Sequence, residues 1–358
     1  MPVSASNNRF YGINGSYPTY SVFSVDSQAN SLISYAQGPY FIEFNQNLPD
    51  GTLLGIAGNQ LTGIDALVKS DLQGNVNPFY QFPLGEVLPG YTTYGTDGNY
   101  YGVSWQEYIN GSYSTGGYIY QVTPAGVLNK LYTLPLGTFS TISYSVPIQW
   151  GTDGNLYGVT TTGGANGYGS IYQLTIAGQF TTLYSFPKGP GAYPTSLIQA
   201  SDGNLYVASI GVDQYRYGQL SRFTTTGQYT FLHAMAGGSG SCPCTLTQGS
   251  DAAIYGTAGF GGAGGGTIFA LNAGLPIPAP NALNISPSSG PPETKVRIWG
   301  YNMLKATVSF NGTAATKVTH SGPNYVFALV PKGATSGPIT VITPGGTSTT
   351  PTSFTVTK

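Results

Sequence analysis

Acidic residues recur at a fixed place in this sequence, and a ring of carboxylates is one arrangement that binds cations. Asp97, Asp153 and Asp202 each open an Asp-Gly-Asn triplet. Asp and Asn also stabilise tight hairpin turns through local backbone hydrogen bonds, and Gly supplies a positive φ. The copy at Asp251 continues as Asp-Ala-Ala, which a metal site would tolerate poorly. We therefore interpret these acids as turn residues and predict no metal site.

The sequence offers no group of residues suited to acid–base or nucleophilic catalysis. Its only histidines, His233 and His320, fall in different parts of the chain, the first in a predicted strand and the second in a predicted turn. A hydrolase needs a base within hydrogen-bond reach of its nucleophile or of a second acid. We therefore predict no catalytic residues, no cofactor and a non-enzymatic protein.

Two cysteines, Cys242 and Cys244, flank Pro243. A pair this close in sequence closes only a small, strained ring, so it is not a disulfide framework. No second pair is present to complete a zinc site. Two interpretations stay open for these residues: loop thiols, or one local disulfide between them.

Aromatic residues gather in the longest insertion and also recur once per repeat. The residues in the insertion are Trp105, Tyr108, Tyr113, Tyr118 and Tyr120. Loops are where binding functions concentrate, so Trp105, Tyr108 and Tyr113 are candidate contacts for a glycan or a protein. The recurring tyrosines are Tyr11, Tyr101, Tyr157, Tyr206 and Tyr255. We interpret this second set as packing between neighbouring repeats rather than as a sugar-stacking ring.

These residues belong to a repeat whose copies are 43 to 56 residues apart. An array of this period is typical of four-stranded propeller blades. The best-defined copy predicts strands over 146–150, 156–160, 170–175 and 180–186, each rich in β-branched and aromatic residues and bounded by Gly, Asn or Pro. We predict an all-β chain that begins with a β-propeller of about six four-stranded blades over residues 1–274.

The two ends of the array are incomplete. The first copy begins at its second strand, and the last copy stops after its third. A propeller needs a closed ring, because open sheet edges promote association. Residues 2–6 are a candidate for the strand at this seam. The alternative is a strand from the other domain or from another molecule.

One stretch carries a family resemblance. Residues 153–164 read Asp-Gly-Asn-Leu-Tyr-Gly-Val-Thr-Thr-Thr-Gly-Gly, followed by Gly-Ser-Ile-Tyr-Gln-Leu-Thr at 169–175 and Leu-Tyr-Ser-Phe at 183–186. In this pattern the chain resembles the bacterial choice-of-anchor tandem-repeat (GloVer) proteins over about residues 8–272, most clearly over 95–272. The resemblance implies a secreted or surface-anchored protein and implies no particular activity.

A change in composition separates the repeats from the remainder. Residues 275–280 read Leu-Pro-Ile-Pro-Ala-Pro, which predicts a stiff, extended linker. Residues 281–358 carry Ile-Ser-Pro-Ser-Ser-Gly-Pro at 285–291 and Thr-Lys-Val-Arg-Ile-Trp-Gly at 294–300, and here the chain resembles IPT/TIG domains. That resemblance implies a small immunoglobulin-like β-sandwich that serves as a spacer, adhesion or assembly module.

Charge is sparse and unevenly divided. Only 7% of the residues are charged, and the net charge of −1 divides into −6 over residues 1–280 and +5 over residues 281–358. Opposite charges on the two parts could draw one copy onto the next. Neither part carries the dense basic clusters of a nucleic-acid-binding protein.

The surface composition predicts an extracellular protein of the bacterial cell surface. The sequence contains no run of about 18 apolar residues, so we predict no membrane span. No signal peptide is visible at the amino terminus, and we expect an export signal outside this sequence. Four sequons make the protein a candidate glycoprotein, at Asn14, Asn110, Asn284 and Asn311.

Together these features predict a non-enzymatic structural or adhesive protein. We expect it to self-associate, or to bind other surface proteins, through propeller-to-sandwich or strand-addition contacts that build a surface fibre or layer. Contacts between unlike surfaces generate open filaments when the rotation between copies does not close. The alternative is a glycan-binding or polysaccharide-active secreted protein that uses the loop face of the propeller.

Overall fold

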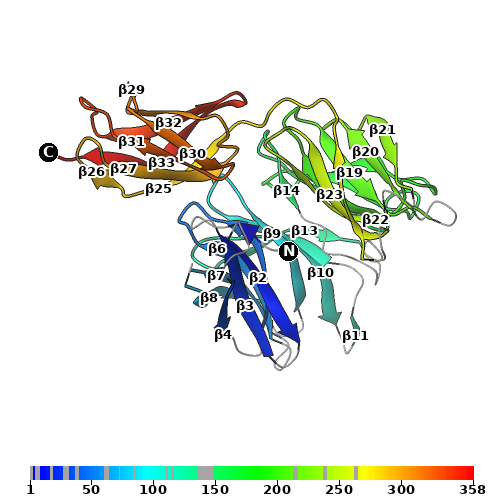
Figure 1. Cartoon of the computed structure of the whole chain (residues 1–358). Coiled ribbons are helices and arrows are strands. Elements are labelled where there is room, and N and C mark those ends of the chain that lie inside the picture. The colour runs from blue at the N-terminus through cyan, green and yellow to red at the C-terminus, as the bar shows by residue number, and fades with distance from the viewer. Residues whose placement is uncertain are drawn as a thin grey trace.

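The computed structural model consists of strands and connections, and it contains no helix among the residues that it describes. It describes the chain except residues 1–2, 5–8, 17–18, 27–31, 37–39, 60–63, 72, 84–85, 110–111, 114–116, 136–147, 213–216, 237–239 and 262–264. Six antiparallel sheets follow one another through residues 3–271, and we call them the first to sixth repeat sheets. Two further sheets form the C-terminal part, which appears in Figure 1 as a separate lobe at the upper left.

The strands of each repeat sheet pair in chain order, so a complete sheet has a first, second, third and fourth strand. The first sheet contains β1 (Val3–Ser4), β2 (Arg9–Ser16), β3 (Thr19–Asp26) and β4 (Leu32–Ala36). The second contains β5 (Tyr40–Asn47), β6 (Leu53–Asn59), β7 (Ile64–Ser70) and β8 (Val76–Gln81). The third contains β9 (Glu86–Tyr94), β10 (Tyr100–Ile109), β12 (Gly117–Val122) and β13 (Leu128–Leu134), with β11 (Ser112–Tyr113) paired to the end of β10.

The fourth sheet contains β14 (Gln149–Trp150), β15 (Leu156–Thr160), β16 (Ser170–Leu174) and β17 (Phe180–Ser185). The fifth contains β18 (Pro194–Gln199), β19 (Leu205–Ser209), β20 (Gln219–Phe223) and β21 (Tyr229–Ala234). The sixth has three strands in the described residues, β22 (Ser241–Gln248), β23 (Ile254–Phe260) and β24 (Thr267–Leu271). The sequence pattern predicted the three strands of this last copy. Residues 2–6 were one candidate for the strand at the seam, and β1 of this stretch pairs with β2, so the first sheet has the first strand that its sequence pattern lacked.

Apolar clusters join each of the later sheets to the next. Tyr157 of the fourth sheet packs among Leu197 and Leu205 of the fifth, and all three side chains are fully buried. Tyr101 and Tyr206 occupy the same position in the clusters that join the third sheet to the fourth and the fifth sheet to the sixth. Tyr101, Tyr157 and Tyr206 therefore pack between neighbouring repeats, as their period predicted, whereas Tyr255 is half-buried in the last sheet and the side chain of Tyr11 lies outside the described residues.

In the third, fourth and sixth sheets, the glycine that follows the recurring tyrosine makes room for a ring on the third strand. Gly158 pairs with Tyr172, and a Cβ at Gly158 would overlap the Tyr172 ring. The third and sixth sheets repeat the arrangement as Gly102–Tyr120 and Gly256–Phe269. In the fifth sheet the larger residue is on the second strand and the smaller one on the third, because Val207 pairs with Ser221. Cross-strand pairs of complementary size thus fix the register of the repeat.

The C-terminal part is formed by two sheets packed around one core. One sheet has the order β25-β27-β31-β30 and the other β26-β33-β32-β28-β29. The strands are β25 (Asn281–Ser286), β26 (Ser289–Gly290), β27 (Lys295–Tyr301), β28 (Thr307–Phe310), β29 (Thr313–Ala314), β30 (Val318–Gly322), β31 (Tyr325–Leu329), β32 (Gly337–Thr343) and β33 (Gly346–Val356). Alternate residues such as Val296 and Ile298 point into the core, where they meet Phe354 of the other sheet. His320 lies in β30 and not in a turn, which corrects the prediction from sequence.

The two parts of the chain touch at more than the linker. Asn47 at the end of β5 donates from Nδ2 to the Tyr301 hydroxyl at 3.3 Å. The linker is also held to the repeat part, because the Ser201 hydroxyl of the fifth sheet donates to the Pro276 carbonyl at 2.5 Å. In Figure 1 the linker runs over the top of the molecule from β24 toward β25. None of the described residues belongs to a helix that could span a membrane.

Candidate functional site at the open edge of the sixth repeat sheet

The acidic turn residues are engaged in local hydrogen bonds. In the fourth sheet Asp153 Oδ1 accepts the backbone N–H of Asn155 at 3.1 Å, and Asp153 Oδ2 accepts the Tyr157 hydroxyl at 2.7 Å. The Tyr157 oxygen accepts from Gln173 Nε2 at 2.7 Å. Equivalent Asp–Tyr bonds of 2.5, 3.0 and 2.6 Å join Asp97 to Tyr101, Asp202 to Tyr206 and Asp251 to Tyr255. These contacts bear out the interpretation of the acids as turn residues.

The Asp–Tyr bond was not anticipated from the sequence, although a signal for it was present. The copy at Asp251 loses the Gly and Asn of the triplet and keeps only the acid and Tyr255. Burial opposes ionisation of Asp153, but the bonds from Tyr157 and Asn155 outweigh it and hold the pKa of Asp153 below its usual value. Burial, aided by the carboxylate, raises the pKa of Tyr157 to about 12. The phenol is therefore a donor that anchors the turn to the packed tyrosine.

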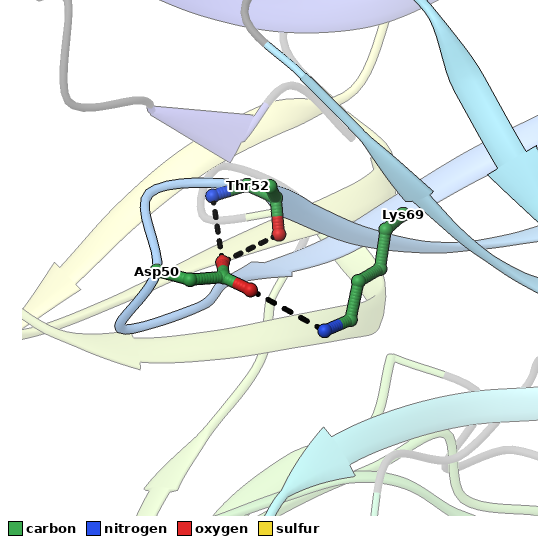
Figure 2. Close-up of polar contacts among 3 residues, drawn as sticks. All are labelled: Asp50, Thr52 and Lys69. Carbon is green, nitrogen blue, oxygen red and sulfur yellow. Dashed lines mark hydrogen bonds and ion pairs between the residues drawn. The ribbon is translucent and has the colours of Figure 1, made fainter. Parts of the chain in front are cut away.

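The second sheet builds the same corner from different residues (Figure 2). Leu54 holds the tyrosine position, and Lys69 pairs directly across from it. Lys69 Nζ lies 3.3 Å from Asp50 Oδ2, while Asp50 Oδ1 accepts the N–H and the hydroxyl of Thr52 at 2.9 and 2.6 Å. The ammonium also lies 5.5 Å from the centre of the Tyr100 ring. Both charged side chains are partly exposed, so this pair contributes little stability. The corner therefore joins the first turn of the second sheet to β7.

A different repeated contact joins the fourth strands, and it leads to the end of the array. Tyr132 of β13 stacks on Phe180 of β17 with ring centres 4.1 Å apart, and Tyr184 of β17 stacks on Tyr229 of β21 at 5.9 Å. In both contacts the fifth residue of one fourth strand meets the first residue of the next. The fifth residue of β21 is His233, which is exposed. The sixth sheet has no fourth strand to meet it in the described residues.

The turn that leads into each fourth strand also rests on the preceding sheet. A Cβ on the turn glycine would lie 3.0 Å or less from a carbonyl oxygen of the preceding fourth strand. The pairs are Gly126 with Phe79, Gly178 with Leu131, and Gly227 with Leu183. Glycine is required here twice, because its φ is also positive, between +78° and +87°. Leu232 carries the corresponding carbonyl on β21.

Ile268 on β24 is exposed at a position where its counterparts are buried. Those counterparts on the third strands are Ile119, Ile171 and Leu220, with exposed fractions of 0%, 0% and 3%. Ile268 is 81% exposed. Ile171 shows what covers this position, because it packs against Phe186, just after the fourth strand, and Leu197, on the first strand of the next sheet.

The glycine before β24 has the same backbone conformation as the glycines before the third strands of the complete sheets. The N–H groups of Phe186 and Met235, which follow β17 and β21, each donate at 2.9 Å to the carbonyl of a glycine before the third strand, Gly169 and Gly218. These glycines have φ values of +98° and +84°. Gly266, before β24, has the same left-handed conformation, with φ at +85°. The sixth sheet therefore repeats the acceptor geometry of its complete neighbours.

The chain turns away after β24 instead of forming a fourth strand. Residues 272–274 make a turn in which Asn272 Oδ1 accepts the N–H of Gly274 at 3.2 Å. Leu275 then packs against the cluster around Tyr206. The Pro276 carbonyl is held by Ser201 of the fifth sheet. We call β24 together with Leu232, His233 and Gly266 the open edge.

The aromatic residues predicted as loop contacts lie elsewhere. Trp105 and Tyr108 are in β10 and Tyr113 is in β11, and Tyr108 pairs with Tyr113 across the hairpin. Their side chains lie outside the described residues. Tyr118 and Tyr120 belong to β12 and are fully buried, so they are core residues and not part of an insertion.

The predicted glycosylation sites fall in varied surroundings. Asn14 is in β2, and Asn110 lies outside the described residues. Asn284 is half-buried in β25. Asn311 is exposed in the turn after β28, where its Nδ2 donates to Thr335 Oγ1 at 2.9 Å and to the Ser336 carbonyl at 3.1 Å. Glycosylation at these positions stays a prediction.

Cys242 and Cys244 lie in strand β22 and not in a loop, which corrects one of the two interpretations from sequence. Both side chains are thiols in the structure, so the local disulfide stays a prediction. Within the described ranges, no group of three or more His, Cys, Asp and Glu side chains could hold a metal ion.

Sheets of one pattern, each joined to the next by recurring contacts, define an all-β tandem-repeat protein. Residues 88–275 match the model of a family described as the Gloeobacter/Verrucomicrobia repeat. The match spans more than half of the chain, and the chain belongs to this bacterial repeat family. No functionally curated protein matches the sequence.

Solved structures resemble the chain at low identity. They include the gluconolactonase XC5397 of Xanthomonas campestris, with 13% identity and a TM-score of 0.48 over 75% of this chain and 84% of that one. TolB of Acinetobacter baumannii has 13% identity and a TM-score of 0.48 over 93% of this chain and 66% of TolB. A functionally unknown protein of Desulfotomaculum acetoxidans has 12% identity and a TM-score of 0.47 over 94% of each chain. Values of this size assign no activity, and enzymatic function stays open.

Proposed function

We propose that this chain is an extracellular structural protein of the bacterial surface that self-associates, with the open edge of one copy receiving an extended strand from a second copy. In this proposal the repeat sheets are the blades of a six-bladed β-propeller. The C-terminal part is an immunoglobulin-like sandwich of the IPT/TIG type, and the assembly is a fibre or a layer. The observation that carries the proposal is the 81% exposure of Ile268 at a position buried in the three preceding sheets.

Exposed sheet edges with large apolar side chains are sites of strand addition. The contacts of the preceding sheets define what the open edge would accept. Its occupant carries an aromatic residue at its first position to stack on His233, a leucine at its fourth and a large apolar residue at its seventh to cover Ile268. In the fourth sheet these three positions are occupied by Phe180, Leu183 and Phe186.

A second copy of this chain is favoured as the donor by charge. The repeat part carries −6 and the C-terminal part +5, so the unlike parts of two copies attract each other. A contact between unlike surfaces propagates when it does not close on itself. The few charges of the repeat part also leave little repulsion between sheets that meet edge to edge.

The test compares two lysine substitutions at exposed isoleucines. Ile268→Lys places a charge on the open edge, whereas Ile176→Lys places it in the turn before β17, where the isoleucine is 51% exposed. We expect the wild-type protein and Ile176→Lys to form assemblies in negative-stain images and light scattering. Ile268→Lys should stay dispersed under the same conditions.

A peptide of residues 175–186, which has the sequence of a fourth strand, provides a second measurement. In excess it should disperse wild-type assemblies, and a scrambled peptide should not. A wild-type protein that remains monomeric at every concentration and salt would refute self-association. Assemblies that survive Ile268→Lys would place the contact elsewhere, and binding on a glycan array without assembly would favour the glycan-binding alternative.

A further inference from the structure

Two thiols converge on the first strand of the sixth sheet, at a kink in its backbone. The pairing of β22 with β23 runs from Pro243 opposite Ala258 to Thr245 opposite Thr257, so Cys244 is the extra residue of a β-bulge. Cys242 adopts a left-handed conformation with a φ of +59°. Bulges bend a strand and re-aim its side chains.

The bulge turns the two cysteines toward each other. The Cys244 thiol donates to the carbonyl oxygen of Cys242, with Sγ and O 3.0 Å apart. Across the ladder lies Gly259, which has no side chain. A Cβ built there would be 3.8 Å from Cys244 Sγ and 4.0 Å from Cys242 Cβ, so parts of both cysteines face one small site. The buried Thr195 hydroxyl donates to the Pro243 carbonyl at 2.6 Å and holds the residue between them.

The two thiols differ in access. Cys242 is buried, with 8% of its surface exposed, whereas Cys244 is half-buried and reaches solvent. Hydrogen bonding from the Cys242 side chain lowers the pKa of Cys244 to about 7, although burial opposes the shift. An accessible thiol of low pKa beside a second, sheltered thiol is the arrangement of a dithiol that exchanges with disulfides.

We propose that Cys242 and Cys244 form a thiol–disulfide exchange site, in which Cys244 attacks and Cys242 resolves. The substrate class is a small-molecule or protein disulfide, R–S–S–R′. The Cys244 thiolate attacks one sulfur, the S–S bond breaks, and R′ leaves as a thiolate that takes up a proton. Cys242 then gives up its proton and attacks Cys244 Sγ, so R leaves as the second thiol. The two cysteines lose two electrons in forming their bond, and the substrate disulfide gains them.

Ring size makes this exchange reversible. A disulfide between residues i and i+2 closes a small ring, and strained disulfides are the ones that are readily reduced. An excess of substrate disulfide forms the Cys242–Cys244 bond, and an excess of thiol reduces it again, so the bond is not a permanent cross-link. This inference is independent of the proposed strand addition, because it concerns the first strand of the sixth sheet and not the edge of the third.

The test uses glutathione disulfide and the full-length protein. Wild type should lose two hydrogens by mass and recover them with excess reduced glutathione. In Cys242→Gly, the new glycine tolerates the left-handed conformation of this position. This variant should stop at the mixed disulfide, so its mass should increase by one bound glutathione. Cys244→Ser, the matched variant, should remain unmodified. The melting temperature of each variant shows whether it is folded.

The pH dependence of alkylation distinguishes this arrangement from two ordinary thiols. With iodoacetamide, wild-type Cys244 should react with a midpoint near pH 7, and Cys242→Gly should shift that midpoint toward the ordinary value of about 8.5. A wild-type protein that stays reduced, or that accumulates a stable glutathione adduct, would overturn the proposal. So would an alkylation midpoint that does not move in Cys242→Gly.

Discussion

The fifth and sixth repeat sheets share the arrangement of their first three strands and differ at one edge. Both begin with a bulged first strand, and both carry an Asp–Tyr bond at the first turn. The fifth then adds β21 through a tight turn at residues 224–228, whereas the sixth continues into the linker. Leu220 and Ile268 occupy the same register, yet the exposed fraction is 3% for the first and 81% for the second. In the described residues the sixth sheet thus forms with three strands, and it lacks the fourth-strand contacts that join the earlier sheets to one another.

The largest expected contrast comes from placing a charge at the two equivalent positions. Leu220→Lys buries an unpartnered ammonium group and should lower the free energy of unfolding by about 4 kcal/mol or more. Ile268→Lys should change it by no more than about 0.5 kcal/mol in dispersed protein. Urea unfolding of both variants measures the difference. Equal losses would mean that Ile268 is covered within a single copy.

A smaller contrast is expected where glycine faces a ring. Gly158→Val places a side chain against the fully buried ring of Tyr172 and should cost about 3 kcal/mol. Adding Tyr172→Ser to Gly158→Val copies the Val207–Ser221 pair of the fifth sheet. Thermal melts of the double-mutant cycle should show favourable coupling of about 1 kcal/mol. Simple additivity would refute the complementary-volume explanation.

The smallest contrast concerns alkaline pH. Burial, together with the bond to Asp202, raises the pKa of Tyr206 to about 12 from 10.0, so the folded state favours the neutral phenol. This stabilisation is complete below pH 10 and is lost as the pH rises from about 10 to 12. Tyr206→Phe should flatten the fall in melting temperature over that range, and Tyr255→Phe should change it less because Tyr255 is more exposed.

Tyr217→Phe, at a residue that is 52% exposed, serves as the control for these alkaline melts. If Tyr206→Phe and Tyr217→Phe behave alike, the Asp–Tyr bond of the fifth sheet does not contribute to the pH dependence.

Local signals in the sequence were sufficient for the strands of the best-defined copy, β15 to β17 above all, and for the three strands of the last copy in the described residues. The Asp-Gly-Asn triplet at Asp153 specifies its own turn through bonds to its own backbone, so residues two positions apart carry the information. The packing role of Tyr157 followed from the same period.

The candidate site could not be predicted in the same way, because its contacts depend on register between distant strands. The stacking of Tyr184 on Tyr229 and the approach of Gly227 to Leu183 join residues about 45 positions apart. Likewise, the convergence of Cys242 and Cys244 depends on a bulge opposite Gly259, which no local pattern announces.

Each turn glycine packs against the preceding fourth strand, and these contacts also determine the order in which the repeat sheets should unfold. Gly227 lies close against the Leu183 carbonyl, and Gly178 lies close against the Leu131 carbonyl. Arrays with nearest-neighbour contacts open from the end that has the fewest neighbours. Local unfolding should therefore start at β24 and travel backward through β21, and the amide hydrogens of β24 should exchange with solvent before those of β16. A strand bound to β24 would therefore slow local unfolding along the whole array of repeat sheets.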